Sequence, residues 1–174
     1  LGALDREMGG LVDSQVFEEV LDPDTVDPDY ITSLLERLTV KQCGTHKIRI
    51  AARGDQLPPN DEFENFAPVI RLDTLRLFLA IAAIRGTYVW AGEVSQAYLR
   101  APAMDEAYIV GPGYFPVPMR GKLLRIKKAL YGLGASGKAW YQFLRNALQN
   151  LGWHQSAVDE CLWWRSTPTG REFL

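Results

Sequence analysis

Basic side chains recur at alternate positions in two short stretches of the chain. In residues 45–53, Lys47 and Arg49 alternate with apolar residues, and Arg53 ends the stretch. A second cluster holds five bases within nine positions: Arg120, Lys122, Arg125, Lys127 and Lys128. A period of two places such bases on one face of a β-strand. Paired cations on one face suit a polyanionic ligand, but a solvated strand face explains the same pattern.

The charge of the chain is divided unevenly along its length. Residues 1–40 carry ten acids and two bases, a net charge of −8, whereas residues 41–174 carry seventeen bases and eleven acids, a net charge of +6. This division predicts that residues 1–40 form an acidic N-terminal arm, which contains a helix. The arm is joined to a body, residues 41–174, that has an anionic partner. Contacts between the bases and phosphates would make that affinity salt-dependent.

The composition excludes several classes of protein. A chain of 174 residues that is 47% hydrophobic and 23% charged is typical of a globular domain, not of a disordered tail, a collagen-like fibre or a coiled coil. Cys43 and Cys161 form neither a disulfide framework nor a zinc motif. The longest apolar run, residues 77–84, is too short to cross a bilayer, so we expect no membrane partner. Without a secretory signal, and with Leu as first residue, the chain is expected to be an intracellular piece of a longer product.

Helices and strands alternate among the elements that must position these residues. Asp27 as N-cap and Pro28 at the first helical position predict a helix that runs to about Thr39. Residues 71–85 are typical of a buried helix that ends at Gly86. The other expected elements are a short helix around 11–20, strands at 45–53, 87–94 and 122–127, a helix at 136–151 and a hairpin over 161–174. This order predicts a mixed α/β or α+β fold, with a mixed sheet and packed helices.

Seven segments, taken in order, match the motifs of one family. Residues 47–56 (KIRIAARGDQ) resemble the family's K-A-R-L-V-A-R-G-x-x-Q, residues 64–69 (ENFAPV) resemble E-T-F-A-P-V, and residues 74–76 (TLR) resemble T-I-R. Residues 93–99 (EVSQAYL) resemble D-V-x-x-A-F-L, and residues 108–114 (YIVGPGY) resemble Y-M…P-x-G-F. The last two are L-Y-G-L at 130–133 followed by Trp140, and Gly-Trp at 152–153 followed by D-x-C-L at 159–162. Over about residues 40–174 the chain resembles the reverse transcriptase domain of copia-type LTR retrotransposons. The resemblance implies the fingers and palm of a right-hand polymerase, without the thumb or an RNase H domain.

The resemblance implies RNA-directed DNA synthesis by two Mg²⁺ ions, which activate the primer 3′-oxygen and neutralise the departing pyrophosphate. Hard cations need oxygen ligands, and the family's first metal-binding aspartate corresponds here to Glu93. Glu93 is therefore the expected catalytic and metal-binding residue. Its side chain has one methylene more than aspartate, which moves the carboxylate oxygens, and a displacement of ~1 Å can cost on the order of 10²-fold in rate. An exposed glutamate at a strand end is the alternative. The family's Y-x-D-D motif would follow Leu174, so we expect this chain alone to be inactive.

The resemblance also assigns the substrate contacts. Lys47 and Arg49 would hold the incoming triphosphate, and Val94 and Tyr98 would line the nucleotide site, with Tyr98 stacked under the sugar. The expected nucleic-acid contacts are Arg53, Arg125, Lys127, Lys128 and Lys138. Each has an alternative: Tyr98 can be a core aromatic, and the bases can be solvated. Ala135 replaces a family glutamine near the nucleotide, which removes one contact.

The implied partners are an RNA or DNA template with its primer, deoxynucleoside triphosphates, and the remaining parts of a polyprotein (thumb, RNase H and integrase). The expected locations are the cytoplasm, the nucleus or a virus-like particle. Two other functions remain open because of Glu93 and Ala135. One is a repurposed module that binds nucleic acid without catalysis, and the other is an inert remnant whose unpaired sheet edge promotes aggregation. Trp163 and Trp164 should point to opposite faces of a strand, one of them into the core.

Overall fold

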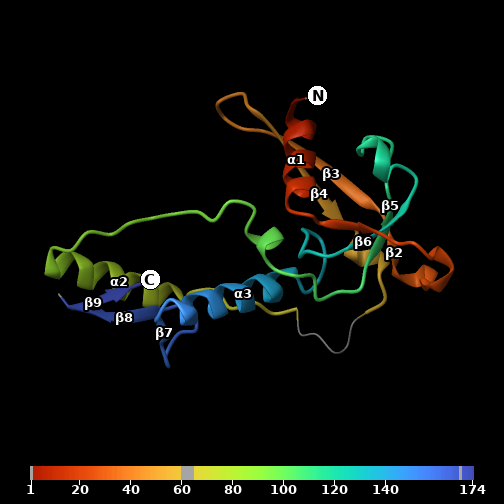
Figure 1. The fold of residues 1–174 in the computed structure, drawn as a ribbon. Coiled ribbons are helices and arrows are strands. Elements are labelled where there is room, and N and C mark those ends of the chain that lie inside the picture. The colour runs from red at the N-terminus through yellow and green to blue at the C-terminus, as the bar shows by residue number, and fades with distance from the viewer. Residues whose placement is uncertain (1, 60–64, 169) are drawn as a thin grey trace. The chain divides into compact units, whose positions relative to one another are not determined.

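A computed structural model describes residues 2–59, 65–168 and 170–174 (Figure 1). The protein is a mixed α/β structure, as predicted, with antiparallel and parallel strand pairs. The chain forms two compact units that interleave along the sequence. Unit 1 comprises residues 1–66 and 96–140, and unit 2 comprises residues 67–95 and 141–174. In the part of the chain that is described, no helix combines the length and the apolar character needed to cross a bilayer.

The main sheet of unit 1 has four strands in the order β1-β6-β5-β2. These are β1 (Phe17–Glu19), β6 (Leu123–Ile126), β5 (Tyr108–Val110) and β2 (Ile31–Thr32). Strand β6 runs antiparallel to both β1 and β5, whereas β2 is parallel to β5. The observed β6 confirms the strand expected at 122–127.

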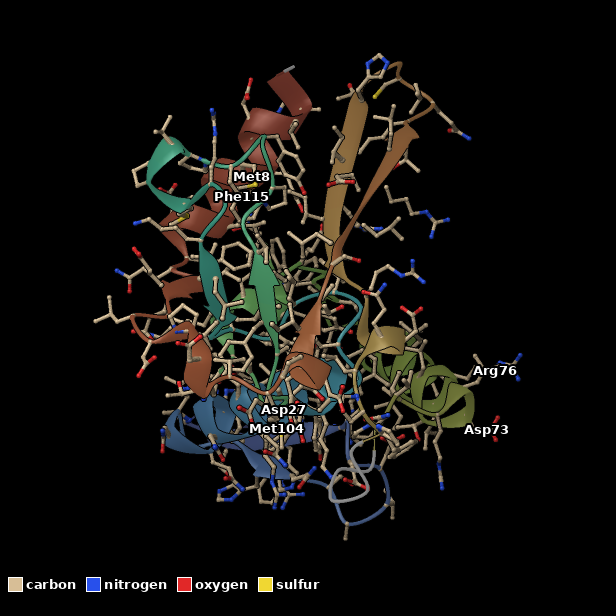
Figure 2. The ribbon with its side chains drawn as sticks, turned by 90° about the vertical axis from the view of Figure 1, so that its right-hand side faces the viewer. Met8, Asp27, Asp73, Arg76, Met104 and Phe115 are labelled. Carbon is tan, nitrogen blue, oxygen red and sulfur yellow. The ribbon has the colours of Figure 1, made fainter. Side chains whose placement is uncertain are left out.

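The core of unit 1 includes residues from the acidic N-terminal segment. Helix α1 (Gly2–Asp13) contributes Met8 and Leu11, and the Phe17 ring lies 5.1 Å from the Phe115 ring, centroid to centroid. Met8 and Phe115 belong to the same cluster of buried side chains (Figure 2). A boundary between arm and body at residue 40 stays a prediction.

A two-stranded hairpin forms the second sheet of unit 1. Strands β3 (Leu34–Val40) and β4 (His46–Ala52) pair antiparallel along their whole length. Because side chains alternate along a strand, Ile50 and Ala52 enter the core while Arg49 is exposed on the other face. The strand predicted at 45–53 is therefore confirmed.

The helix predicted from Pro28 to Thr39 is wrong. Asp27 does act as a cap, since its Oδ1 accepts a hydrogen bond from the Asp29 N–H at 3.0 Å. The helical turn ends after Pro28–Tyr30, and the chain continues into β2 and β3. Pairing along β4 overrides the local helix signal, because tertiary context outweighs propensity. The helix expected around 11–20 is also misplaced, since α1 ends at Asp13 and β1 comes next.

Unit 2 contains α2 (Leu72–Arg85), most of α3 (Ser136–Asn150) and a three-stranded antiparallel sheet. The strands are β7 (His154–Gln155), β8 (Trp163–Thr167) and β9 (Gly170–Phe173). The helix at 136–151 and the hairpin over 161–174 are confirmed, although Thr169 of the hairpin lies outside the described residues. As predicted, Gly86 ends α2 in the left-handed conformation, with φ of 60°.

Two expectations for unit 2 are wrong. Helix α2 is not buried: Leu77 and Ile84 are 62% and 85% exposed, and a 3.9 Å ion pair joins Asp73 to Arg76 on its surface (Figure 2). An apolar composition on all sides of a helix does not by itself supply a covering partner. Residues 87–94 form no strand, and Trp90 is 90% exposed. Although their composition favours a strand, these residues pair with no other strand among the described residues.

Candidate functional site

One face of the β3–β4 hairpin concentrates positive charge. Arg37 lies directly opposite Arg49, and Thr39 lies opposite Lys47, so the three bases share the face that points away from Ile50. Arg37 and Arg49 are exposed, and Lys47 is half-buried. Among the described residues, no carboxylate forms an ion pair with any of the three. We call Arg37, Lys47 and Arg49 the basic hairpin face.

Two tyrosines adjoin this face. The guanidinium carbon of Arg49 lies 5.5 Å from the ring centroid of Tyr131, a cation–π distance. The Tyr131 ring in turn lies 4.9 Å from the Tyr98 ring, at an interplanar angle of 42°. The structure thus links two predicted nucleotide-site residues, Arg49 and Tyr98, through a third side chain. Aromatic rings beside cations offer a surface on which the sugar and base of a nucleotide can stack.

Glycines at two positions allow the Tyr131 loop to lie against the end of β4. The Ala52 N–H donates to the Tyr131 carbonyl at 2.7 Å. Gly132 has φ of +91°, and a Cβ atom there would collide with the Ala52 carbonyl oxygen. A Cβ atom at Gly54 would collide with the Gly132 carbonyl oxygen. The backbone contact that places Tyr131 beside Arg49 therefore depends on both glycines.

The base of the hairpin is held by Gln56. Its side-chain oxygen accepts hydrogen bonds from the Ser33 N–H and hydroxyl, both at 2.9 Å, and from the Thr32 hydroxyl at 3.0 Å. Thr32 is buried and can also donate to the Arg53 carbonyl at 2.7 Å. The glutamine of the 47–56 motif thus links the β2–β3 connection to the turn after β4 by hydrogen bonds. These bonds stabilise the base of the hairpin that carries the basic hairpin face.

Several other basic residues that were predicted to contact nucleic acid form ion pairs with carboxylates. Arg53 binds Asp55 at 2.6 Å, which raises the pKa of Arg53 and lowers that of Asp55. Lys127 pairs with Glu18 at 3.1 Å, and Arg125 lies opposite Glu18 in the β1–β6 ladder. Strand β1 thus neutralises part of the basic cluster on β6, so these bases are weaker anion-binding candidates than the basic hairpin face.

Lys128, in the segment that leads into α3, and Lys138, in the first turn of α3, are both half-buried. Asp105 holds the start of that helix, because its Oδ2 accepts a hydrogen bond from the Ala135 N–H at 3.1 Å. Burial raises the pKa of Asp105, although this hydrogen bond opposes the shift. Asp105 thus contacts the backbone one residue before α3, in whose first turn Lys138 lies.

Glu93 and Val94 belong to unit 2, outside the basic hairpin face of unit 1. Both lie in the extended 87–94 segment, and both are exposed. Within the described residues, no group of three or more His, Cys, Asp or Glu side chains could hold a metal ion. Glu93 therefore belongs to no such group in the described part of the chain, and one carboxylate does not complete a magnesium site.

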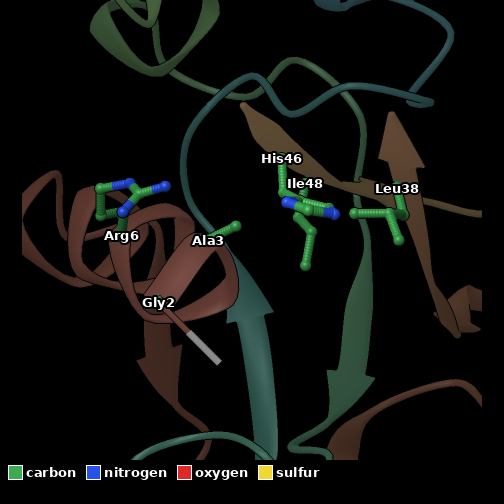
Figure 3. Close-up of a pocket in the computed structure, with 6 residues that line it drawn as sticks. All are labelled: Gly2, Ala3, Arg6, Leu38, His46 and Ile48. Atoms are coloured by element: carbon green, nitrogen blue, oxygen red, sulfur yellow. The ribbon is translucent and has the colours of Figure 1, made fainter. Parts of the chain in front are cut away.

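A hollow of about 360 Å³ lies on the other face of the hairpin (Figure 3). It is lined by Gly2, Ala3, Arg6, Leu38, His46 and Ile48. Leu38 and Ile48 are cross-strand partners, one position along from the Arg37–Arg49 pair, so they point to the opposite face. The hollow is therefore separate from the basic hairpin face.

Sequence reasoning missed two residues of this arrangement. Arg37 falls within the helix that was predicted from Pro28 to Thr39, so it was not expected to lie beside Arg49. Pairing of Leu34–Val40 with β4 places Arg37 opposite Arg49. Tyr131 stood inside a recognised motif, but nothing in the sequence indicated which strand it contacts. Glu64, in the E-T-F-A-P-V segment, lies outside the described residues.

The sequence of this chain matches a known family over most of its length. Residues 26–174 match the family described as reverse transcriptase (RNA-dependent DNA polymerase). The chain belongs to this family, which confirms the resemblance to copia-type reverse transcriptases.

Individual relatives agree with this assignment. The chain is similar to the Transposon Ty1-DR4 Gag-Pol polyprotein of Saccharomyces cerevisiae, with 32% identity over 154 residues, which is 87% of this chain and 10% of the relative. The Transposon TyH3 Gag-Pol polyprotein of the same species matches at 32% identity over 154 residues, 87% of this chain and 9% of the relative. The chain thus spans about a tenth of the length of these curated relatives. No solved structure matches it.

Proposed function

We propose that this chain forms the fingers and part of the palm of an RNA-directed DNA polymerase within a copia-type polyprotein. The observation that carries the proposal is the basic hairpin face with its adjoining tyrosines, in a chain that belongs to the reverse transcriptase family. The face would bind the incoming deoxynucleoside triphosphate.

The three cations suit the triphosphate because guanidinium groups bind phosphate oxygens in bidentate geometry. Arg37 and Arg49 lie on facing strands, so a phosphate between them would relieve their mutual repulsion. Lys47, opposite Thr39, would add a third charge. Tyr131 and Tyr98 would then receive the sugar, next to the cation that holds the phosphates.

Magnesium is expected for the family, but the described residues do not by themselves make its site. We propose Glu93 as one ligand, in the position of the family's first aspartate. The steps proposed for the residues of the basic hairpin face and its tyrosines are binding and orientation of the nucleotide.

The remaining contacts are proposed for the template and primer. Lys128 and Lys138 are candidates for phosphate contacts, and Arg53, Arg125 and Lys127 would act only after release from their acidic neighbours. The thumb, RNase H and integrase portions of a polyprotein are the proposed partners. The proposed place of action is intracellular: the cytoplasm, the nucleus or a virus-like particle.

A second candidate is a module that binds nucleotides or nucleic acid without catalysis. Glu93 favours this alternative, because it is exposed and belongs to no group of three or more possible metal ligands among the described residues. Primer extension by a longer polyprotein segment that continues beyond residue 174 distinguishes the two candidates. Extension above background that is lost in Glu93→Gln supports the polymerase, whereas nucleotide binding without extension supports the module.

The nucleotide-binding proposal can be tested directly on this chain. Titration with dTTP should give a measurable affinity, and Arg49→Gln should weaken it about tenfold, since hydrogen bonds to charged groups contribute about 1.5–3 kcal/mol. Tyr131→Phe keeps the ring and should bind normally, whereas Tyr131→Leu should bind more weakly. Arg85→Gln removes an equal charge at the end of α2 and is the control. An equal loss in Arg49→Gln and Arg85→Gln would refute the proposed site.

A further inference from the structure

The β7–β8–β9 sheet of unit 2 carries aromatic and basic side chains on one face. His154 lies opposite Trp164, which lies opposite Phe173, and Arg171 lies opposite Ser166. Cross-strand partners share a face, and next-nearest residues along a strand share it too. His154, Trp164, Phe173 and Arg171 therefore project from the same side of this sheet, which we call the aromatic sheet face.

The side chains of this face contact one another in a row. The His154 and Trp164 rings lie 4.8 Å apart, centroid to centroid. The guanidinium carbon of Arg171 lies 4.9 Å from the Trp164 ring centroid. His154, Arg171 and Phe173 are exposed, and Trp164 is half-buried. Rings and a guanidinium plane therefore reach solvent together instead of filling the core, where Trp163 is buried.

The opposite face of the same hairpin has a different character. Arg165 contacts the Trp153 ring at 4.6 Å, but it also pairs with Glu172 at 2.7 Å. In contrast, no carboxylate forms an ion pair with Arg171 in the described part of the chain. The two arginines are thus matched in their aromatic contact, but a carboxylate offsets the charge of Arg165, whereas no ion pair offsets that of Arg171 among the described residues.

We propose that the aromatic sheet face binds single-stranded nucleic acid. Unpaired bases stack on aromatic rings and on guanidinium planes, while a free cation attracts the phosphates. In a duplex the faces of the bases are stacked on one another and cannot stack on the protein. An acidic peptide would bind the cation but would not stack on the aromatic rings. The inference rests on the proposed function in one respect, namely that the chain handles nucleic acid. It assigns that contact to residues outside the basic hairpin face.

The test uses the full chain and fluorescein-labelled oligo(dT) and oligo(U) of twenty nucleotides, with a duplex of equal length and inorganic polyphosphate as competitors. Trp164→Leu should weaken oligonucleotide binding about tenfold, as expected for a lost base–aromatic stack. Arg171→Gln should weaken it about threefold or more and reduce the slope of log affinity against log salt by about 0.7. If the variants lose affinity equally for oligo(dT) and oligo(U), the face recognises nucleobases of both DNA and RNA. If they lose affinity for only one of the two, that one is the ligand.

Arg165→Gln is the matched control, because it removes an arginine from the other face of the same hairpin. It should leave oligonucleotide binding nearly unchanged. Equal losses in Arg165→Gln and Arg171→Gln would overturn the proposal, as would stronger competition by polyphosphate or duplex than by unlabelled oligonucleotide. Arg171 is exposed, so Arg171→Gln keeps the test valid if thermal unfolding shows that Trp164→Leu is misfolded.

The same variants separate this inference from the proposed nucleotide site. Trp164→Leu and Arg171→Gln should bind dTTP like the unaltered chain. Loss of oligonucleotide binding in these variants, in a chain that does not bind dTTP at all, would support the aromatic sheet face and refute the nucleotide site. Unchanged oligonucleotide binding in both variants would refute the aromatic sheet face alone.

Discussion

Arg37 and Arg49 stand directly opposite each other across the β3–β4 ladder. Like charges in this position destabilise a strand pair, and no carboxylate among the described residues neutralises either of them. The hairpin therefore carries a local electrostatic cost that a bound anion would remove. Such a conflict between stability and charge is typical of a binding site.

Replacing Arg37 by Glu should move stability and binding in opposite directions. The new cross-strand pair with Arg49 should stabilise the chain by about 0.2–1 kcal/mol, measured by thermal unfolding. The affinity for dTTP, measured by titration, should fall about tenfold or more, because a cation becomes an anion. Arg37→Gln should show smaller changes in both. An Arg37→Glu variant that binds dTTP unchanged would remove Arg37 from the site.

Gly132 should not tolerate a side chain. Gly132→Ala combines an unfavourable positive φ with a collision against the Ala52 carbonyl, so we expect a loss of more than about 2 kcal/mol in the free energy of unfolding. Gly121→Ala is the control, because Gly121 also has a positive φ but has open space around it. It should cost only about 1 kcal/mol, the strain alone. Equal losses in denaturant titrations would show that the close approach to Ala52 is unimportant.

Glu18 and Glu19 should act as internal competitors of nucleic acid. They pair with Lys127 at 3.1 Å and Lys122 at 2.6 Å. The double variant Glu18→Gln, Glu19→Gln should bind a primer–template duplex more tightly, with a slope of log affinity against log salt steeper by up to about 0.9 per lysine freed. Its stability should change by no more than about 1 kcal/mol per pair, because both pairs are on the surface.

The control for this experiment changes the net charge equally without freeing a base. Asp22→Asn with Asp24→Asn removes two exposed acids from the same segment. If this variant gains as much affinity and salt dependence as the Glu18, Glu19 variant, the effect comes from overall charge, and the paired lysines are not phosphate contacts.

Asp159 should stabilise unit 2 in a pH-dependent way. Its carboxylate accepts the N–H groups of Arg71 at 3.0 Å and Cys161 at 2.9 Å, and together with the Thr74 hydroxyl they lower its pKa. The ionised form is thus favoured by folding, so its contribution is present above the ordinary aspartate range and is lost as the pH falls through the lowered pKa. Asp159→Asn should lower the unfolding temperature at pH 7, and the difference should shrink below about pH 4.

Asp73→Asn provides the comparison for Asp159, because Asp73 is an exposed acid in unit 2 with a 3.9 Å contact to Arg76. This variant should unfold within about a degree of the unaltered chain at both pH values, as expected for a surface pair of little energetic weight. A constant difference between Asp159→Asn and the unaltered chain from pH 7 to pH 3 would contradict the assigned role of the carboxylate.

Local signals in the sequence predicted the elements that they control. Alternation around Lys47 and Arg49 indicated β4, and Gly86 marked the end of α2. Trp163 is buried while Trp164 reaches solvent, as expected for neighbours on a strand. These features depend on residues close in sequence.

Contacts between distant residues could not be predicted in this way. The N-cap at Asp27 is real, but the conformation of the next ten residues is decided by β4, which pairs with Leu34–Val40. The position of Tyr131 depends on the Ala52 backbone, almost eighty residues earlier. The composition of residues 87–94 favours a strand, yet a strand requires a partner ladder. The site residues that sequence reasoning missed are those fixed by non-local contacts.

The interleaving of the two units has a practical consequence for dissecting the protein. The chain passes from one unit to the other after residues 66, 95 and 140, so neither unit is a continuous piece of sequence. Cutting the gene at any single point removes parts of both units or leaves one of them incomplete. Expression of unit 1 alone requires a designed linker from residue 66 to residue 96. For unit 2, a circularly permuted or spliced gene would have to join residue 95 to residue 141.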